Sequence, residues 1–230
     1  MELYKEHEDV KHYYDNGELA IEGQQKNGKA TGVWSWYSRN GIKRMEGIVL
    51  KSMEYSCLGN WGSSAARENF NKRLNKYEDF GDWLKFKEGN CKYWDRQGIL
   101  QKSIQYRDSY NTIYTYYHPN GSKQSRGEKA SVSYLANGYY QYRMEPTGEW
   151  TYWHENGTVD KVCSYNHKLP NTLYNKYHGF YVEYYDNGQL ACRVKYLFGH
   201  KKGEETLWNK DGSIDKKIKH GGYLKRLLNI

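Results

Sequence analysis

The sequence lacks any apolar stretch long enough to cross a membrane. Its mean hydropathy over 230 residues is -1.07, whereas a spanning helix needs about 20 consecutive, mostly apolar residues. The first ten residues carry four acidic side chains and no apolar segment of the kind found in secretory signals. We therefore expect a cytoplasmic protein without a membrane span.

Cysteine is scarce, and the motifs of common enzymes are missing. Cys57, Cys91, Cys163 and Cys192 are widely separated singles without CxxC spacing, which favours free buried thiols over disulfides or a zinc site. The patterns GxxxxGK[ST], GxSxG and HExxH are also absent. We expect no catalytic residues, no metal and no cofactor, and hence a protein that is not an enzyme.

Aliphatic residues are few, but aromatic residues are abundant. Leu, Ile, Val and Phe together make up less than a fifth of the chain, a composition that in charged chains often accompanies disorder. However, there are 25 Tyr and 8 Trp residues, and each ring can bury a large area while keeping a polar tip in water. The composition favours an ordered protein with an aromatic core.

Charge is unevenly distributed along the chain. The net charge is +8, yet residues 1–31 hold seven acids and four lysines, while residues 195–230 hold nine basic and four acidic residues. The C-terminal end could therefore attract an acidic partner. A lysine-rich solvated surface would give the same totals, and no known nucleic-acid module is present, so we expect no nucleic-acid partner.

A strand-turn-strand repeat of about two dozen residues recurs seven times. It is marked by an anchor glycine that follows Asn, Asp or Gln, with Tyr or Trp four positions before it (position -4) and a mostly aromatic position -7. Glycine also occupies position -9 in five units, and apolar residues alternate after the anchor, as in a strand with one buried face. Asn-Gly and Asp-Gly tolerate the positive φ angles of tight hairpin turns. The anchors are Gly17, Gly41, Gly98, Gly121, Gly157, Gly188 and Gly212.

Two local questions stay open in this repeat. Positions -7 and -4 are three residues apart, so in an unbroken strand they face opposite sides of the sheet. Either a bulge redirects one ring, or the second face is also partly covered. His118 and His154 occupy position -3 of their units, which predicts exposed turn residues without a catalytic role.

Three longer gaps separate some of the anchors. Residues 50–88 form an insertion in which apolar spacing predicts a short helix near 63–77, and residues 50–90 have room for one further, degenerate repeat. Asn137-Gly138 predicts an extra hairpin, and the segment around Pro170 a longer loop. Residues 221–230 would cap a single repeat domain that spans 1–230.

The repeat cores resemble the bacterial variant of the MORN repeat over most of residues 10–220. The resemblance is carried by GVWSWYSRNG (32–41), GEWTYWHENG (148–157) and GFYVEYYDNG (179–188). It implies an all-β fold, an elongated single antiparallel sheet of tandem β-hairpins. Proteins of this kind include the YwqK-like antitoxin family, which implies a cytoplasmic immunity protein or antitoxin that binds and neutralises a toxin. The alternative is a peripheral membrane or structural scaffold whose basic C-terminal end binds anionic lipid.

Contacts with a protein partner are expected from aromatic and arginine side chains outside the repeat pattern, because interface hot spots favour Tyr, Trp and Arg. Insertions in repeat proteins often map to the binding face. The candidates are Trp61, Arg67, Arg73, Tyr139, Tyr140, Tyr142, Arg143, Tyr174 and Tyr177.

Overall fold

The described part of the chain consists of β-strands and contains no helix. This computed structural model describes residues 7–26, 29–49, 89–107, 111–136, 139–166 and 176–221. The predicted helix near 63–77, the insertion 50–88 and the cap beyond Gly221 lie outside these ranges. The strands are β1 (Glu8–Tyr13), β2 (Leu19–Lys26), β3 (Lys29–Tyr37), β4 (Lys43–Val49), β5 (Gly89–Trp94), β6 (Leu100–Tyr106), β7 (Asn111–Tyr117), β8 (Lys123–Ala136), β9 (Tyr139–Trp153), β10 (Val159–Asn166), β11 (Lys176–Tyr184), β12 (Leu190–Leu197), β13 (His200–Trp208) and β14 (Ile214–His220).

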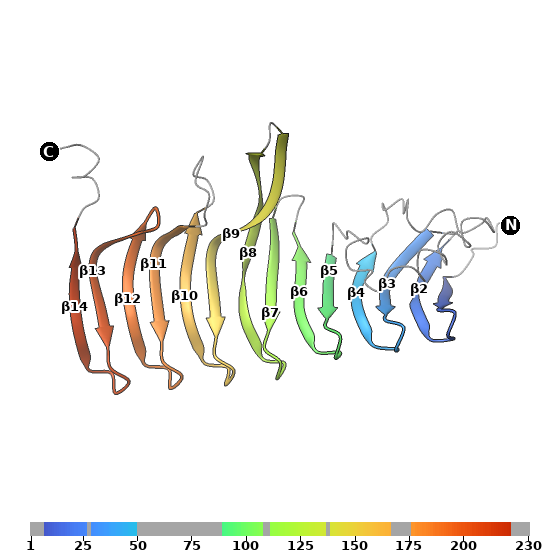
Figure 1. Cartoon of the computed structure of the whole chain (residues 1–230), viewed down its shortest axis with the longest axis horizontal. Coiled ribbons are helices and arrows are strands. Elements are labelled where there is room, and N and C mark those ends of the chain that lie inside the picture. The colour runs from blue at the N-terminus through green and yellow to red at the C-terminus, as the bar shows by residue number, and fades with distance from the viewer. Residues whose placement is uncertain are drawn as a thin grey trace. The chain divides into compact units, whose positions relative to one another are not determined.

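The strands form an open antiparallel sheet of hairpins, in which the strand order follows the chain order from β1 to β14. The all-β fold of tandem hairpins is therefore confirmed. The chain divides into two compact units, residues 1–109 with β1 to β6 and residues 110–230 with β7 to β14. Within each unit, successive strands lie side by side (Figure 1).

The seven turns that contain an anchor glycine all close with the same pair of backbone hydrogen bonds. The N–H at position -3 donates to the carbonyl at +1, and the N–H of the anchor glycine donates to the carbonyl at -3; for Gly157 both bonds measure 2.9 Å. The anchor glycines have φ between 76° and 86°, a region that glycine enters without steric cost. The residue before the anchor glycine does not adopt this positive-φ conformation, since Phe198 is the only non-glycine residue with positive φ in the described ranges.

A β-bulge follows each of these turns. Its position shows whether it redirects the aromatic rings at positions -7 and -4. In the third and fourth strands, Trp36 pairs with Met45 but Tyr37 pairs with Lys43, so the extra residue lies on the return strand. The outgoing strand stays continuous, and the two aromatic positions therefore face opposite sides. Trp34 at -7 is buried, whereas Tyr37 at -4 is half-buried with Lys43 Nζ 5.6 Å from its ring centroid. The second face is thus partly covered, as one of the two alternatives proposed.

The core is built by tryptophan rings that lie directly on glycines of the neighbouring strand. Trp34 lies over Gly23, and Trp150 lies over Gly127; a Cβ atom at either glycine would stand 2.2 Å from the ring. Both rings are almost fully buried, and each indole N–H donates to a backbone carbonyl at 3.0 Å. Glycine is required here because only a bare backbone lets the ring approach so closely.

Candidate protein-binding surface

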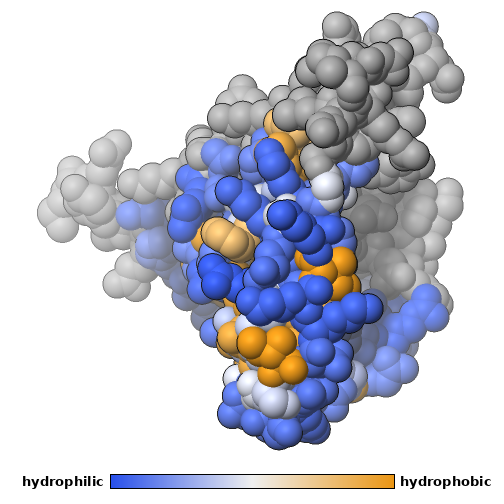
Figure 2. Space-filling model, turned by 90° about the vertical axis from the view of Figure 1, so that its left-hand side faces the viewer, coloured by the Kyte–Doolittle hydropathy of each residue, from blue (hydrophilic) through white to orange (hydrophobic). Residues whose placement is uncertain are grey.

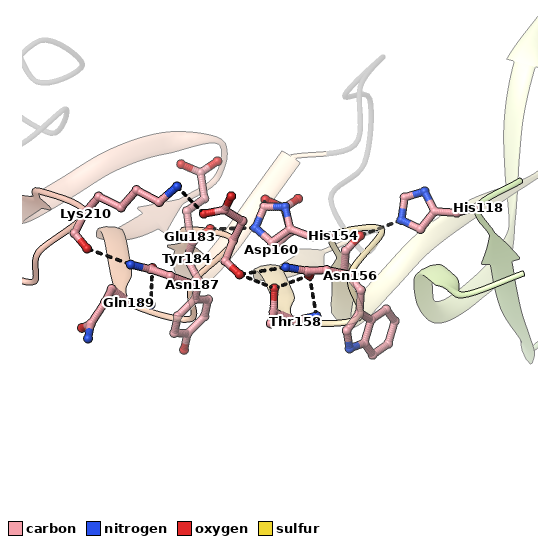
Figure 3. Close-up of polar contacts among 12 residues, drawn as sticks. His118, His154, Asn156, Thr158, Asp160, Glu183, Tyr184, Asn187, Gln189 and Lys210 are labelled. Atoms are coloured by element: carbon pink, nitrogen blue, oxygen red, sulfur yellow. Dashed lines mark hydrogen bonds and ion pairs between the residues drawn. The ribbon is translucent and has the colours of Figure 1, made fainter. Parts of the chain in front are cut away.

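In four of the seven repeats, the asparagine before the anchor glycine links its turn to the next turn along the sheet. The Nδ2 group of Asn156 donates to the backbone carbonyl of Asp186 at 2.9 Å, while its Oδ1 accepts the N–H of Thr158 at 3.0 Å (Figure 3). One side chain therefore closes its own turn and connects it to the following hairpin. The same donor bond to the next turn recurs from Asn16 to Arg39, from Asn120 to Glu155 and from Asn187 to Lys210.

Position -3 supplies a second link between neighbouring turns. His118 Nε2 lies 2.8 Å from the carbonyl oxygen of Trp153, and His154 Nε2 lies 3.1 Å from that of Tyr184. Both rings are half-buried, so the prediction that they are exposed turn residues is wrong. The hydroxyls of Tyr14 and Tyr185 donate to the next hairpin in the same way, at 2.7 Å.

Ion pairs reinforce these contacts at the exposed side of the turns. Asp186 lies 2.6 Å from Lys210 Nζ in the next turn, and Asp15 pairs with Arg39. The hydrogen bond from Lys210 lowers the pKa of the Asp186 carboxyl. Neighbouring turns are therefore joined by three kinds of contact: the asparagine side chains, the side chains at position -3, and ion pairs.

The hairpin β8–β9 is the longest in the described structure, with strands of 14 and 15 residues. Its pairing continues from Ser125 with Tyr152 to Ala136 with Tyr139, and in Figure 1 the strands β8 and β9 extend beyond the neighbouring strands of their unit. The strands that flank Asn137 and Gly138 do pair, but they extend β8 and β9 and do not make a separate hairpin.

This extension carries four of the predicted contact residues. Tyr139 is 77% exposed, and Arg143 is exposed and forms an ion pair with Glu145. In the backbone ladder, Tyr140 pairs with Leu135 and Tyr142 with Ser133. The candidates outside the described residues are Trp61, Arg67, Arg73 and Tyr174.

Tyr177 lies on another strand, β11, within a cluster of tyrosines. Its ring centroid lies 5.1 Å from those of Tyr165, Tyr181 and Tyr196, and the side chain is half-buried. The structure does not bring it together with the β8–β9 extension. Tyr177 therefore contributes mainly packing between β10, β11 and β12.

Glu205 occupies position -7 of the last repeat, where four of the other six repeats carry a large ring, and it is buried. It pairs with Lys201 and lies 2.7 Å from His220 Nε2. Burial raises the pKa of Glu205, but hydrogen bonds from Lys201 and His220 outweigh burial and lower it overall. The exception to the aromatic pattern was visible in the sequence, but its partners were not.

The described cysteines are free and buried, which determines their protonation. Burial raises the pKa of Cys91 to about 12 and that of Cys192 to about 11, with Glu205 adding to the effect on Cys192. These thiols stay protonated at neutral pH, so they are poor nucleophiles. Among the described residues there is no cluster of three or more potential metal ligands, and no helix is long and apolar enough to span a bilayer.

Sequence reasoning missed an exposed aromatic and basic group on β11 to β13. Phe180 is 53% exposed, and Arg193 and Lys195 on β12 lie beside its ring. The basic C-terminal end was the only signal for it, because Phe180 lies within the repeat pattern and the lysines are spread along the chain. Which charges share a face depends on strand register.

Two segments of the chain match the MORN repeat variant family, residues 9–27 and 146–167. The first covers the hairpin β1–β2, and the second covers the end of β9, its turn and β10. No curated protein matches this sequence. Both matched segments contain the asparagine that joins successive turns. Two hairpin segments of this chain are therefore similar to the MORN repeat variant.

Proposed function

We propose that this repeat protein is a cytoplasmic immunity protein or antitoxin, which neutralises a bacterial toxin by binding it and catalyses no reaction itself. The observation that carries the proposal is the β8–β9 extension, with Tyr139 77% exposed on it. A large exposed tyrosine on a paired hairpin suits a binding anchor, because it offers contact area at a low cost in side-chain entropy.

The repeat architecture supports this choice. The turns are joined by side-chain hydrogen bonds such as Asn156 to Asp186, so the sheet presents the extension without having to order it on binding, which lowers the entropic cost of association. The cores at 32–41, 148–157 and 179–188 resemble the bacterial variant of the MORN repeat, which also occurs in the YwqK-like antitoxin family, and on this ground we take a toxin as the partner.

Co-expression with the product of the adjacent gene tests the proposal. We expect the two proteins to co-purify, and cells that express the toxic product to survive when this chain is present. Tyr139→Ala should weaken the complex about tenfold or more, as expected for a hot spot. Tyr13→Ala is the matched control, because Tyr13 is 54% exposed but lies on β1 in the other unit.

Two results would count against the proposal. One is the absence of both a complex and protection when the two proteins are co-expressed at comparable levels. The other is retention of binding and protection by Tyr139→Ala at the level of Tyr13→Ala, which would separate the partner site from the β8–β9 extension.

A further inference from the structure

A group of basic side chains surrounds Phe180 on one face of β11, β12 and β13. The guanidinium carbon of Arg193 lies 4.9 Å from the ring centroid of Phe180, and Lys195 Nζ lies 5.8 Å from it. Phe180 pairs with Lys195, and Lys195 pairs with Lys202 on the next strand. Directly paired residues project from the same face, so these four residues form one surface, which we call the Phe180 patch.

The charges of the Phe180 patch are not neutralised within the described structure. Across the described ranges, no carboxylate lies within ion-pair distance of Arg193, Lys195 or Lys202. Some other lysines of the same unit are paired: Lys217 Nζ lies 2.9 Å from Glu204, and Lys210 Nζ lies 2.6 Å from Asp186.

The arrangement of Lys195 and Lys202 costs stability. Like charges directly opposite each other on neighbouring strands repel, and the exposed ring of Phe180, on the other side of Lys195, adds apolar surface in water. A surface that keeps such features is better explained by a partner that supplies negative charge and an apolar group.

A second exposed ring lies close to the same strand. Phe198, in the turn between β12 and β13, is 44% exposed and has φ of 53°, a conformation that costs a bulky residue about 1–2 kcal/mol. Its ring lies 5.1 Å from that of His178, two residues before Phe180 on β11. The Gly199 N–H donates to the Tyr177 carbonyl at 2.9 Å, which holds this turn against β11.

Basic residues continue from β13 onto β14. Thr206 pairs with Lys217, and Glu204 pairs with Lys219, so two further lysines follow the patch across the sheet, although Lys217 is itself ion-paired with Glu204. Figure 2 shows the β14 side of the molecule, where hydrophilic residues predominate and hydrophobic residues form small, separate areas. A partner at this end would therefore make mainly polar contacts, with apolar contacts at a few points.

We propose that the Phe180 patch binds an acidic protein segment in which carboxylates flank an apolar side chain. The apolar side chain would cover the Phe180 ring, and the carboxylates would pair with Arg193, Lys195 and Lys202; arginine favours carboxylates because it can bond both oxygens at once. A nucleic acid fits less well, because Arg193 and Lys195 already lie beside the ring on which a base would stack. This inference rests on the proposed function only in taking the partner to be a protein.

Fluorescence anisotropy with defined probes tests the patch. The probe is a labelled peptide of three Glu-Leu-Glu triads separated by glycine, and the peptide with Gln in place of Glu is its uncharged control. We expect the acidic peptide to bind the full chain, and Lys195→Gln/Lys202→Gln to raise its Kd about tenfold at near-physiological ionic strength, where surface charges act over about 8 Å. Phe180→Ala should raise the Kd severalfold.

The matched control is Lys26→Gln/Lys216→Gln, which changes the net charge equally. Both lysines are exposed, and neither belongs to the patch: Lys26 ends β2, and Lys216 pairs with Leu207. Equal weakening by the two double variants would overturn the proposal, because it would show that total charge alone matters. Binding of the Gln peptide as tightly as the Glu peptide would also overturn it.

Further arms distinguish other partners and separate this proposal from the proposed function. Tighter, patch-dependent binding of an oligothymidylate of equal charge, or of vesicles containing phosphatidylserine, would overturn the assignment to a protein. If the adjacent gene product forms a complex that Lys195→Gln/Lys202→Gln leaves intact, the patch proposal fails while the proposed function stands. If no such complex exists but the acidic peptide needs the patch, the proposed function fails and the patch stands.

Discussion

Asn156 and the backbone carbonyl of Asp186 are joined by a hydrogen bond of 2.9 Å that connects two successive hairpin turns. The amide is suited to this position because it carries both a donor and an acceptor. Its oxygen accepts the Thr158 N–H of its own turn, and its nitrogen reaches the next turn. Aspartate supplies only the first of these bonds when it is ionised. The last repeat has Asp211 here, and its carboxylate accepts from Ser213.

Asn156→Asp should therefore destabilise the fold, by about 1–2 kcal/mol, because it removes the donor and places a carboxylate against a carbonyl oxygen. Asp211→Asn is the matched control and should change the free energy of unfolding by less than about 0.5 kcal/mol. Urea unfolding followed by tryptophan fluorescence measures both. Equal losses in the two variants would show that the bond to the next turn contributes nothing.

Gly127→Ala should be strongly destabilising, by about 3 kcal/mol, because the added methyl group would overlap the Trp150 ring. Gly221→Ala is the control, since a Cβ there meets no atom within 4 Å. Thermal unfolding and near-ultraviolet circular dichroism report stability and the packing of the ring. Similar melting temperatures for the two variants would contradict the close contact between Trp150 and Gly127.

Glu205 should make the stability of the protein sensitive to acid. Its pKa is lowered in the folded state by Lys201 and His220 despite burial, so its contribution is fully present above the unfolded pKa of about 4.3 and is lost as the pH falls through the lower folded pKa. Glu205→Gln should cost about 2 kcal/mol at pH 7 and reduce the loss of stability below about pH 4.3.

Glu204→Gln provides the control for this pH experiment. Glu204 is adjacent but exposed, and a hydrogen bond from Lys217 lowers its pKa. Solvent screening keeps such pairs weak, so this variant should retain most of the acid dependence. Urea unfolding between pH 7 and pH 3 gives the comparison. A Glu205→Gln profile that parallels the wild-type profile would exclude Glu205 as its source.

Tyr139 and Tyr177 should respond oppositely to truncation, although both were predicted as partner contacts. Tyr177→Ala removes a ring that lies 5.1 Å from three other tyrosine rings and should cost about 3 kcal/mol of unfolding free energy. Tyr139→Ala removes a side chain that is 77% exposed and should cost less than about 0.5 kcal/mol. Thermal unfolding of the isolated protein decides this, and equal losses would contradict it.

The hairpins were predictable because their turns are determined locally. In all seven units, position -4 is the last residue of the outgoing strand and position +2 is the first residue of the return strand. An anchor glycine with positive φ and two backbone hydrogen bonds suffices to close each turn. The all-β class and the hairpin repeat followed from this pattern without knowledge of any distant contact.

The contacts between hairpins were much less predictable. That Trp150 needs Gly127, or that His154 reaches the carbonyl of Tyr184, depends on residues more than twenty positions away. The alignment of successive hairpins is set by irregular strand pairing. Between β8 and β9, for example, Gly127 pairs with Trp150, but Glu128 pairs with Thr147. One such shift changes which side chains meet, and periodicity in the sequence does not reveal it.

The sequence by itself determined the unit of this protein: its strands, its turns and the aromatic residues that fill it, since backbone conformation and alternation act over a few residues. Only the tertiary structure decided how neighbouring hairpin repeats contact one another. It placed Tyr177 in a packed cluster and Tyr139 in solvent, gave Glu205 its two basic partners, and brought Phe180, Lys195 and Lys202 onto one face. The physical reason is that burial and charge at a residue depend on the neighbouring strands, which are aligned by bulges and inter-strand hydrogen bonds.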